Sequence, residues 1–228
     1  MRKYFKTAVY LFVAMYFSVA NADDKVGFFR AVNIDNVNSV NSLLAAGFDP
    51  NTLDEKGQVA LYVALREEAP RVANALLAHP ALKADLSNVA GETPLMMAAL
   101  RGNVAAAAAL ISKGAAVNRP GWTPLHYAVS GRGSNNTSNT TSTNNSTNHG
   151  EAMVQLLLEK GAALEALSPN KTTPLMMASR YGSEELALLL LARGASAKAR
   201  NDQGLDAADF ARLAGREALA RRLDEAGR

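Results

Sequence analysis

Blocks of aliphatic and small residues alternate with short polar breaks along most of the chain. Three of these blocks are nearly identical, GETPLMMA at residues 91–98, GWTPLHYA at 121–128 and KTTPLMMA at 171–178. Each is followed, after a polar break, by an aliphatic run that ends at a glycine. Weaker copies of the pattern stand at residues 26–47, 59–64 and 206–211. The chain is therefore built from internal repeats.

Each repeat is predicted to form two helices. The threonines Thr93, Thr123 and Thr173 can cap a first helix with the hydroxyl, and the proline that follows each one fits the first helical position. The closing glycines stand where a second helix ends in a left-handed residue. These are Gly47, Gly114, Gly161 and Gly194. A helix pair of this kind leaves one apolar side bare, so neighbouring pairs must stack to bury it.

The spacing of the copies identifies the repeat type. With Val26, Val59, Thr93, Thr123, Thr173 and Asp206 as equivalent positions, the separations are 33, 34, 30, 50 and 33 residues. A period of about 33 residues with Thr-Pro-Leu-His-x-Ala resembles the ankyrin-repeat family, and residues 123–128 (TPLHYA) match that motif most closely. The resemblance covers the chain from about residue 24 to its C-terminus.

The resemblance implies an all-α repeat solenoid, an ankyrin array of about six helix-turn-helix repeats with short hairpin loops. The first copy is diverged and the last carries many charged residues, so both are expected to act as caps. The expected repeat domain spans residues 23–228, with repeats near 24–55, 56–87, 88–118, 119–167, 168–200 and 201–228. A basic recognition patch on the last repeat is the alternative, but acidic residues interleave with its arginines.

A polar tract interrupts the fourth repeat. Residues 131–150 are rich in Asn, Ser and Thr and contain no apolar residue. We expect a disordered insertion at 131–150, between the two helices of that repeat. A tolerated surface insertion is favoured over a functional lid.

The first 22 residues resemble a secretory signal peptide. Arg2, Lys3 and Lys6 are followed by an apolar run over residues 8–19 and by Ala20-Asn21-Ala22. We expect cleavage after Ala22, release into the periplasm and no stable membrane insertion afterwards; an uncleaved anchor is the alternative. Without this segment the chain holds 21 basic and 21 acidic residues, so the sequence pI of about 9.2 is no sign of nucleic-acid binding.

Residues with catalytic or metal-binding potential are few. The chain has three histidines and no cysteine, and none of the histidines pairs with another at metal-ligand spacing. His126 occupies the motif histidine, for which the resemblance implies structural hydrogen bonding. No nucleophile elbow or phosphate loop is present. We therefore predict that the chain is not an enzyme and has no catalytic residue, cofactor or metal ion.

Members of the resembled family bind proteins with hairpin tips and inner helices. Transferred onto this sequence, those positions predict a partner-binding set of residues Arg66, Glu92, Arg101, Trp122, Arg180 and Tyr181. Tryptophan, tyrosine and arginine are the types that dominate interface hot spots. The alternative for Trp122 is that it packs against its own repeat.

The function expected from these observations is a non-catalytic protein-binding scaffold exported to the periplasm, monomeric, with a protein partner and no nucleic acid. Exported bacterial proteins that it resembles include immunity proteins that neutralise toxins. An accessory protein for a periplasmic enzyme such as catalase, or a secreted host-directed effector, are the alternatives.

Overall fold

The computed structural model describes residues 23–131 and 146–228. The predictions for residues 1–22 and for most of the insertion lie outside these ranges. The chain divides into two compact units, unit 1 over Met1–Gly91 and unit 2 over Glu92–Arg228. The single repeat domain over residues 23–228 stays a prediction.

Unit 1 contains two helix pairs. A helix over residues 23–33 is followed by α2 (Val37–Ala45), and α3 (Ala60–Arg66) is paired with α4 (Pro70–Ala78). Phe28 is fully buried and its ring lies 4.5 Å from that of Phe48. Asp35 links the pairs, since its Oδ1 accepts from Val72 N–H at 2.9 Å and its Oδ2 from Arg71 Nε at 2.9 Å. Burial raises the pKa of Asp35, but these hydrogen bonds and the Arg71 charge outweigh it and hold the pKa below its ordinary value.

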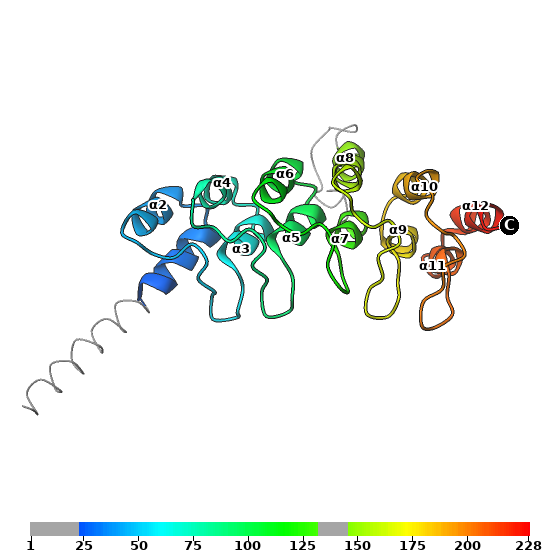
Figure 1. The fold of residues 1–228 in the computed structure, drawn as a ribbon, viewed down its shortest axis with the longest axis horizontal. Helices are drawn as coiled ribbons and strands as arrows, with labels where there is room; N and C mark the ends of the chain where they lie inside the picture. Colours follow the sequence, from blue (N-terminus) through cyan, green and yellow to red (C-terminus); the bar gives the residue numbers. More distant parts are fainter. Residues whose placement is uncertain (1–22, 132–145) are drawn as a thin grey trace, which may run out of the picture. The chain divides into compact units, whose positions relative to one another are not determined.

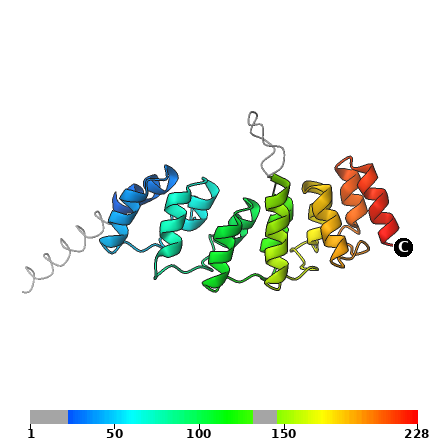
Figure 2. The ribbon, with the colours of Figure 1, turned by 90° about the horizontal axis from the view of Figure 1, so that it is seen from above.

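Unit 2 contains four helix pairs that follow one another along the chain (Figure 1). The first helices are α5 (Pro94–Leu100), α7 (Pro124–Ser130), α9 (Pro174–Tyr181) and α11 (Ala207–Leu213). The second helices are α6 (Val104–Ser112), α8 (Ser146–Glu159), α10 (Glu184–Ala192) and α12 (Glu217–Ala226). Each first helix packs on the next one. Figure 2 shows the helix pairs of unit 2 from above, in chain order. The predicted all-α helix-pair architecture is confirmed.

The first helices begin as the sequence predicts. The hydroxyls of Thr93 and Thr173 accept from the backbone N–H three residues on, at 3.3 Å in both cases, and a proline follows each. The first helix of the last pair uses Asp206, whose carboxylate accepts from Asp209 N–H at 3.1 Å. Thr123 also contacts the side chain of the residue three positions on, since its hydroxyl lies 2.9 Å from His126 Nδ1.

The second helices α2, α6, α8 and α10 end at the predicted glycines, whereas α4 ends at His79. Gly47, Gly114, Gly161 and Gly194 have φ values of 94°, 90°, 85° and 93°. This is the left-handed region, which glycine enters without the steric cost of a Cβ atom. The chain then turns into the hairpin of the next repeat.

Stacking buries the same position in successive copies. The leucine two residues after each cap threonine, Leu95, Leu125 and Leu175, is at most 1% exposed. Polar side chains also link neighbours, since Asn118 donates to the Gly161 carbonyl at 2.7 Å and accepts from Ala163 N–H at 2.8 Å. Each pair of unit 2 is therefore held by apolar burial and by backbone-directed hydrogen bonds.

The last pair of unit 2 has the polar outer surface of a cap. Leu219, Ala220 and Leu223 of α12 are buried, whereas Arg221 and Arg222 are exposed. Arg222 pairs with Glu184 at 2.9 Å, and the arginine of α11, Arg212, binds both Asp209 and Asp224. The basic residues here are thus largely neutralised, which favours a cap over a basic recognition patch.

One boundary of the predicted insertion is wrong. Helix α8 begins at Ser146, so residues 146–150 are helical rather than part of a disordered loop. Once a helix is nucleated on its buried face, each further residue costs little to add, so α8 extends by a turn into the polar tract. Over the residues that the structure describes, no helix combines the length and the apolar character needed to cross a membrane.

Close packing between neighbouring first helices makes two glycines sensitive to substitution. A Cβ at Gly182 would lie 2.4 Å from the Val129 carbonyl oxygen, and one at Gly131 would lie 2.4 Å from that of Leu100. We predict that Gly182→Ala and Gly131→Ala each lower the free energy of unfolding by about 1–3 kcal/mol, because the helices must move apart. Urea denaturation followed by circular dichroism measures the change.

Gly150→Ala is the matched control for these variants. Gly150 lies in α8, and an added Cβ would make an ordinary contact 3.5 Å from Leu186. The exchange should raise the free energy of unfolding by about 0.5–1 kcal/mol, since alanine favours a helix over glycine. Equal stability of the three variants would contradict the packing described here.

Candidate functional site

Equivalent residues of the first helices form rows in unit 2, because α5, α7, α9 and α11 lie next to one another. The row four residues after the caps is Met97, Tyr127, Met177 and Phe210. The row seven residues after the caps is Leu100, Ser130, Arg180 and Leu213. Both rows are dominated by methionine, aromatic and aliphatic side chains.

A surface hollow lies where these rows meet the hairpin that precedes α7. It has a volume of about 230 Å³ and is lined by Leu100, Trp122, His126, Tyr127, Ser130 and Met177. We call the surface formed by Leu100, Trp122, Tyr127, Ser130, Met177 and Arg180 the first-helix face.

Trp122 forms one wall of the hollow. It is 36% exposed, and its ring meets the buried His126 edge to face, with centroids 5.3 Å apart and an interplanar angle of 81°. One side of the indole is therefore packed on its own repeat while the other stays accessible. Trp122 therefore packs against its own repeat and also has a surface that a partner could contact, so each of the two sequence interpretations describes part of its environment.

His126 fixes the base of the hollow. Its Nδ1 accepts from Thr123 N–H at 3.2 Å, so the proton is on Nε2, which donates to the Thr172 carbonyl of the next repeat at 3.0 Å. Burial lowers the pKa of His126, although the Thr172 and Ala166 carbonyls favour the charged form. His126 is thus a neutral link between two repeats, and the structural role expected for it is confirmed.

Glu92 supports the next side chain along the face. Its Oε1 accepts a hydrogen bond of 2.8 Å from the Tyr127 hydroxyl, so Glu92 orients a residue of the hollow from the preceding hairpin. Arg101 is the exposed C-cap residue of α5, next to Leu100. Of these two predicted residues, Glu92 contacts a lining residue of the hollow, and Arg101 follows a lining residue in sequence.

Arg180 and Tyr181 extend the face beyond Met177. The Arg180 guanidinium lies 5.2 Å from the centroid of the Tyr181 ring and 6.0 Å from that of Phe210. Tyr181 is 49% exposed, and Leu213 of the neighbouring helix is 57% exposed. Both distances are within the range of about 6 Å over which a cation is attracted to the face of an aromatic ring.

Arg66 belongs to unit 1 and is separate from the other five predicted residues. Its Nε lies 2.7 Å from Glu67 Oε1, and it lines a groove of about 460 Å³ with Phe29, Arg30 and Glu55 among others. The predicted set therefore falls into a five-residue group in unit 2 and one residue in unit 1.

Sequence reasoning missed Tyr127 and Ser130 as lining residues. Both occupy positions that repeat four and seven residues after each cap, so alignment of the copies by their caps could have found them. Among the described residues, no three His, Asp or Glu side chains are close enough to hold a metal ion together.

Comparison with known proteins identifies the repeat type. A family model of ankyrin repeats (three copies) matches residues 71–140 and 131–202. The NF-kappa-B p105 subunit of Gallus gallus is 30% identical over 172 residues, 73% of this chain and 16% of that protein. Glycerophosphocholine phosphodiesterase gde1 of Schizosaccharomyces pombe (strain 972 / ATCC 24843) is 34% identical over 96 residues, 40% of this chain and 8% of that protein. The chain spans less than a fifth of the length of these two relatives.

Among solved structures, a similar chain occurs in the complex of the predatory endopeptidase Bd0816 from Bdellovibrio bacteriovorus with the immunity protein Bd3460. The TM-score is 0.68 at 24% identity, over 87% of this chain and 97% of that chain. At this identity the likeness concerns the fold alone.

The lowered pKa of His126 predicts a pH-dependent stability. Below the ordinary value of 6.5 the unfolded chain takes up a proton at this histidine while the folded chain does not, so stability is lost as the pH falls from about 6.5 toward the folded pKa. The slope is at most about 1.4 kcal/mol per pH unit. Urea denaturation at pH values between about 7.5 and 5.5 measures it.

His126→Met is the control that the chain itself supplies. Met96 and Met176 stand at the equivalent position, and their sulfur atoms accept from the Thr93 and Thr173 N–H groups at 3.4 Å. The variant should fold and show a shallower pH dependence. If the free energy of unfolding changed equally with pH in both proteins, the protonation of His126 would not be coupled to folding.

Proposed function

Because the chain belongs to the ankyrin-repeat family, we propose that it is an exported, non-catalytic scaffold that binds a partner enzyme through unit 2 and neutralises it. The family supplies the general mode of action, which is protein binding. The surface, the class of partner and the compartment each follow from a separate feature of the chain.

One observation carries the proposal, the composition and exposure of the first-helix face. Trp122 is 36% exposed, and Tyr181 and Leu213 near the face are 49% and 57% exposed. Exposed aromatic and aliphatic residues that cluster on one face are typical of protein interaction sites. The neighbouring arginines add the residue type most enriched with tryptophan and tyrosine at hot spots.

The partner class is proposed from the structural likeness. The similar solved chain occurs in a complex between an endopeptidase and an immunity protein. A scaffold that covers a peptidase or another toxic enzyme needs a rigid face and no reactive group of its own. The first-helix face has this character, because five of its six residues lie on helices that pack on one another and His126, beneath it, is buried.

Export is proposed from residues 1–22. We predict that the full chain, expressed in a Gram-negative host, appears in the osmotic-shock fraction with Asp23 as its first residue, because Ala20-Asn21-Ala22 fits a cleavage site. N-terminal sequencing of the released protein measures this. Recovery of the uncleaved chain in the membrane fraction would favour an anchor, and recovery in the culture medium would favour a secreted effector.

Neutralisation is tested with the purified chain as bait in periplasmic extract. The captured enzyme is identified by mass spectrometry and assayed with and without an equimolar amount of the chain. We expect loss of its activity. A captured enzyme whose activity is unchanged or increased, as for an accessory protein of a catalase, would contradict neutralisation while leaving protein binding intact.

The same pair of proteins tests the surface. We predict that Trp122→Ala and Tyr181→Ala each weaken partner binding by about 2 kcal/mol or more, roughly a thirty-fold rise in Kd, because they remove exposed aromatic anchors. Isothermal titration calorimetry measures the change, with circular dichroism to show an intact fold.

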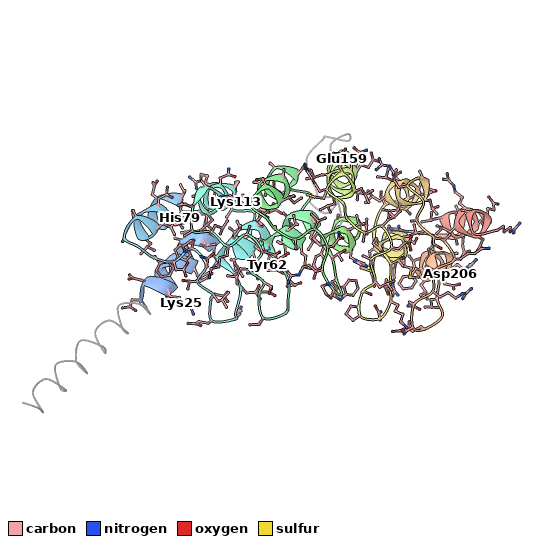
Figure 3. The ribbon with its side chains drawn as sticks, in the orientation of Figure 1. Lys25, Tyr62, His79, Lys113, Glu159 and Asp206 are labelled. Carbon is pink, nitrogen blue, oxygen red and sulfur yellow. The ribbon has the colours of Figure 1, made fainter. Side chains whose placement is uncertain are left out.

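Glu159→Ala is the control for surface mutation. Glu159 is exposed at the end of α8, on the side of the second helices, whereas Asp206 lies on the hairpin side (Figure 3). Its removal should leave Kd unchanged. Unchanged affinity of both aromatic variants would remove the first-helix face from the interface.

A further inference from the structure

The three helices that form the first-helix face carry a single charge. Their sequences are PLMMAAL in α5, PLHYAVS in α7 and PLMMASRY in α9, and Arg180 is the only charged residue among them, since His126 is buried and neutral. Arg101 adds a second positive charge at the C-cap of α5. The face therefore offers apolar contacts with the positive charge of Arg180 on the α9 side, while the Glu92 carboxylate lies at the Tyr127 hydroxyl.

Arg180 differs from the other cations of this region. Lys171 pairs with Asp202 at 2.8 Å, Arg200 with Asp206 at 3.3 Å, and Arg212 with two aspartates. Arg180 has no carboxylate partner within the described part of the chain, and its guanidinium is held over the rings of Tyr181 and Phe210. A guanidinium has five N–H donors, so a cation without an intramolecular carboxylate partner can pair with a carboxylate of a bound protein.

The hollow beside Arg180 has the size of one side chain. Its volume of about 230 Å³ lies below the range of about 300–1,000 Å³ usual for small-molecule sites. Its walls are the indole of Trp122, the ring of Tyr127 and the thioether of Met177. Aromatic rings and methionine sulfur both make favourable contacts with an inserted aromatic ring.

The hollow and the cation are adjacent. Met177 and Arg180 stand three residues apart on α9, which places them side by side on one face of the helix with Cβ atoms about 5–6 Å apart. An extended chain advances about 3.3–3.6 Å per residue. A partner segment that fills the hollow can therefore reach Arg180 with a residue about one to three positions away.

We propose that the first-helix face recognises a partner segment in which an aromatic side chain fills the hollow at Trp122 and a nearby Asp or Glu pairs with Arg180. This inference rests on the proposed function only in that the face binds a protein. The partner segment has an aromatic residue that is followed or preceded by an Asp or Glu, and this chemistry does not depend on which enzyme carries the segment.

The test uses a displayed library of random peptides, selected on the immobilised chain. We expect enrichment of peptides with Phe, Tyr or Trp within about three residues of Asp or Glu. A selected peptide should change the fluorescence of Trp122, which is the only tryptophan of the chain. Its Kd should rise at least about ten-fold with Arg180→Gln and with Trp122→Ala.

Charge variants separate recognition from folding. Selection on Arg180→Glu should shift the enriched charge from Asp or Glu to Lys or Arg, whereas Arg180→Lys should keep the acidic preference. Arg193→Glu changes the same charge at the exposed C-cap of α10 and is the matched control. It should leave the preference of the selected peptides for Asp or Glu unchanged. Circular dichroism establishes that each variant is folded.

Two outcomes would overturn the inference: selected peptides without the aromatic and acidic pair, or an acidic preference that persists in Arg180→Glu. Neither result bears on enzyme neutralisation, which is measured with the captured enzyme. Conversely, a chain that fails to inhibit any enzyme can still select the predicted peptides, so the two proposals fail separately.

Discussion

The structure depends on the inability of one helix pair to cover its own apolar side. In unit 2, Leu125 of α7 is fully buried because the first helices before and after it, α5 and α9, both pack against α7. Close approach is possible because glycine ends α7 and α9, where a Cβ would collide with a carbonyl of the preceding first helix. Burial of Leu125 and its equivalents therefore determines the distance between neighbouring first helices. That distance in turn brings the equivalent exposed side chains of successive repeats next to one another.

Much of the fold could be predicted because its signals are local and repeated. The Thr-Pro start and the glycine end of a helix depend on backbone chemistry at one or two residues, so Thr93, Thr173 and Gly114 behave as predicted. The start of α8 could not be located from the sequence. Residues 146–150 are polar and have no helical pattern of their own, and they are helical because they extend a helix that the following apolar residues nucleate.

The candidate site was predictable only in part. Residue type and family position pointed to Trp122 and Tyr181, and the structure places both at the surface of unit 2. The hollow itself depends on three helices, since Leu100, Tyr127 and Met177 come from α5, α7 and α9. No sequence window contains such a set. The stacking of Arg180 over Phe210 is equally a property of two helices, and it is what distinguishes this arginine from the ion-paired cations nearby.

The proposed binding site for the partner enzyme is the first-helix face of unit 2. Hydroxyl-radical footprinting of the chain, free and in complex with the captured enzyme, tests this directly because aromatic residues and methionines are the most readily oxidised. We expect the oxidation of Trp122, Tyr181 and Met177 to fall when the complex forms, while the oxidation of Leu188 and Leu189 of α10 stays the same. Protection confined to the second helices, or to unit 1, would contradict it.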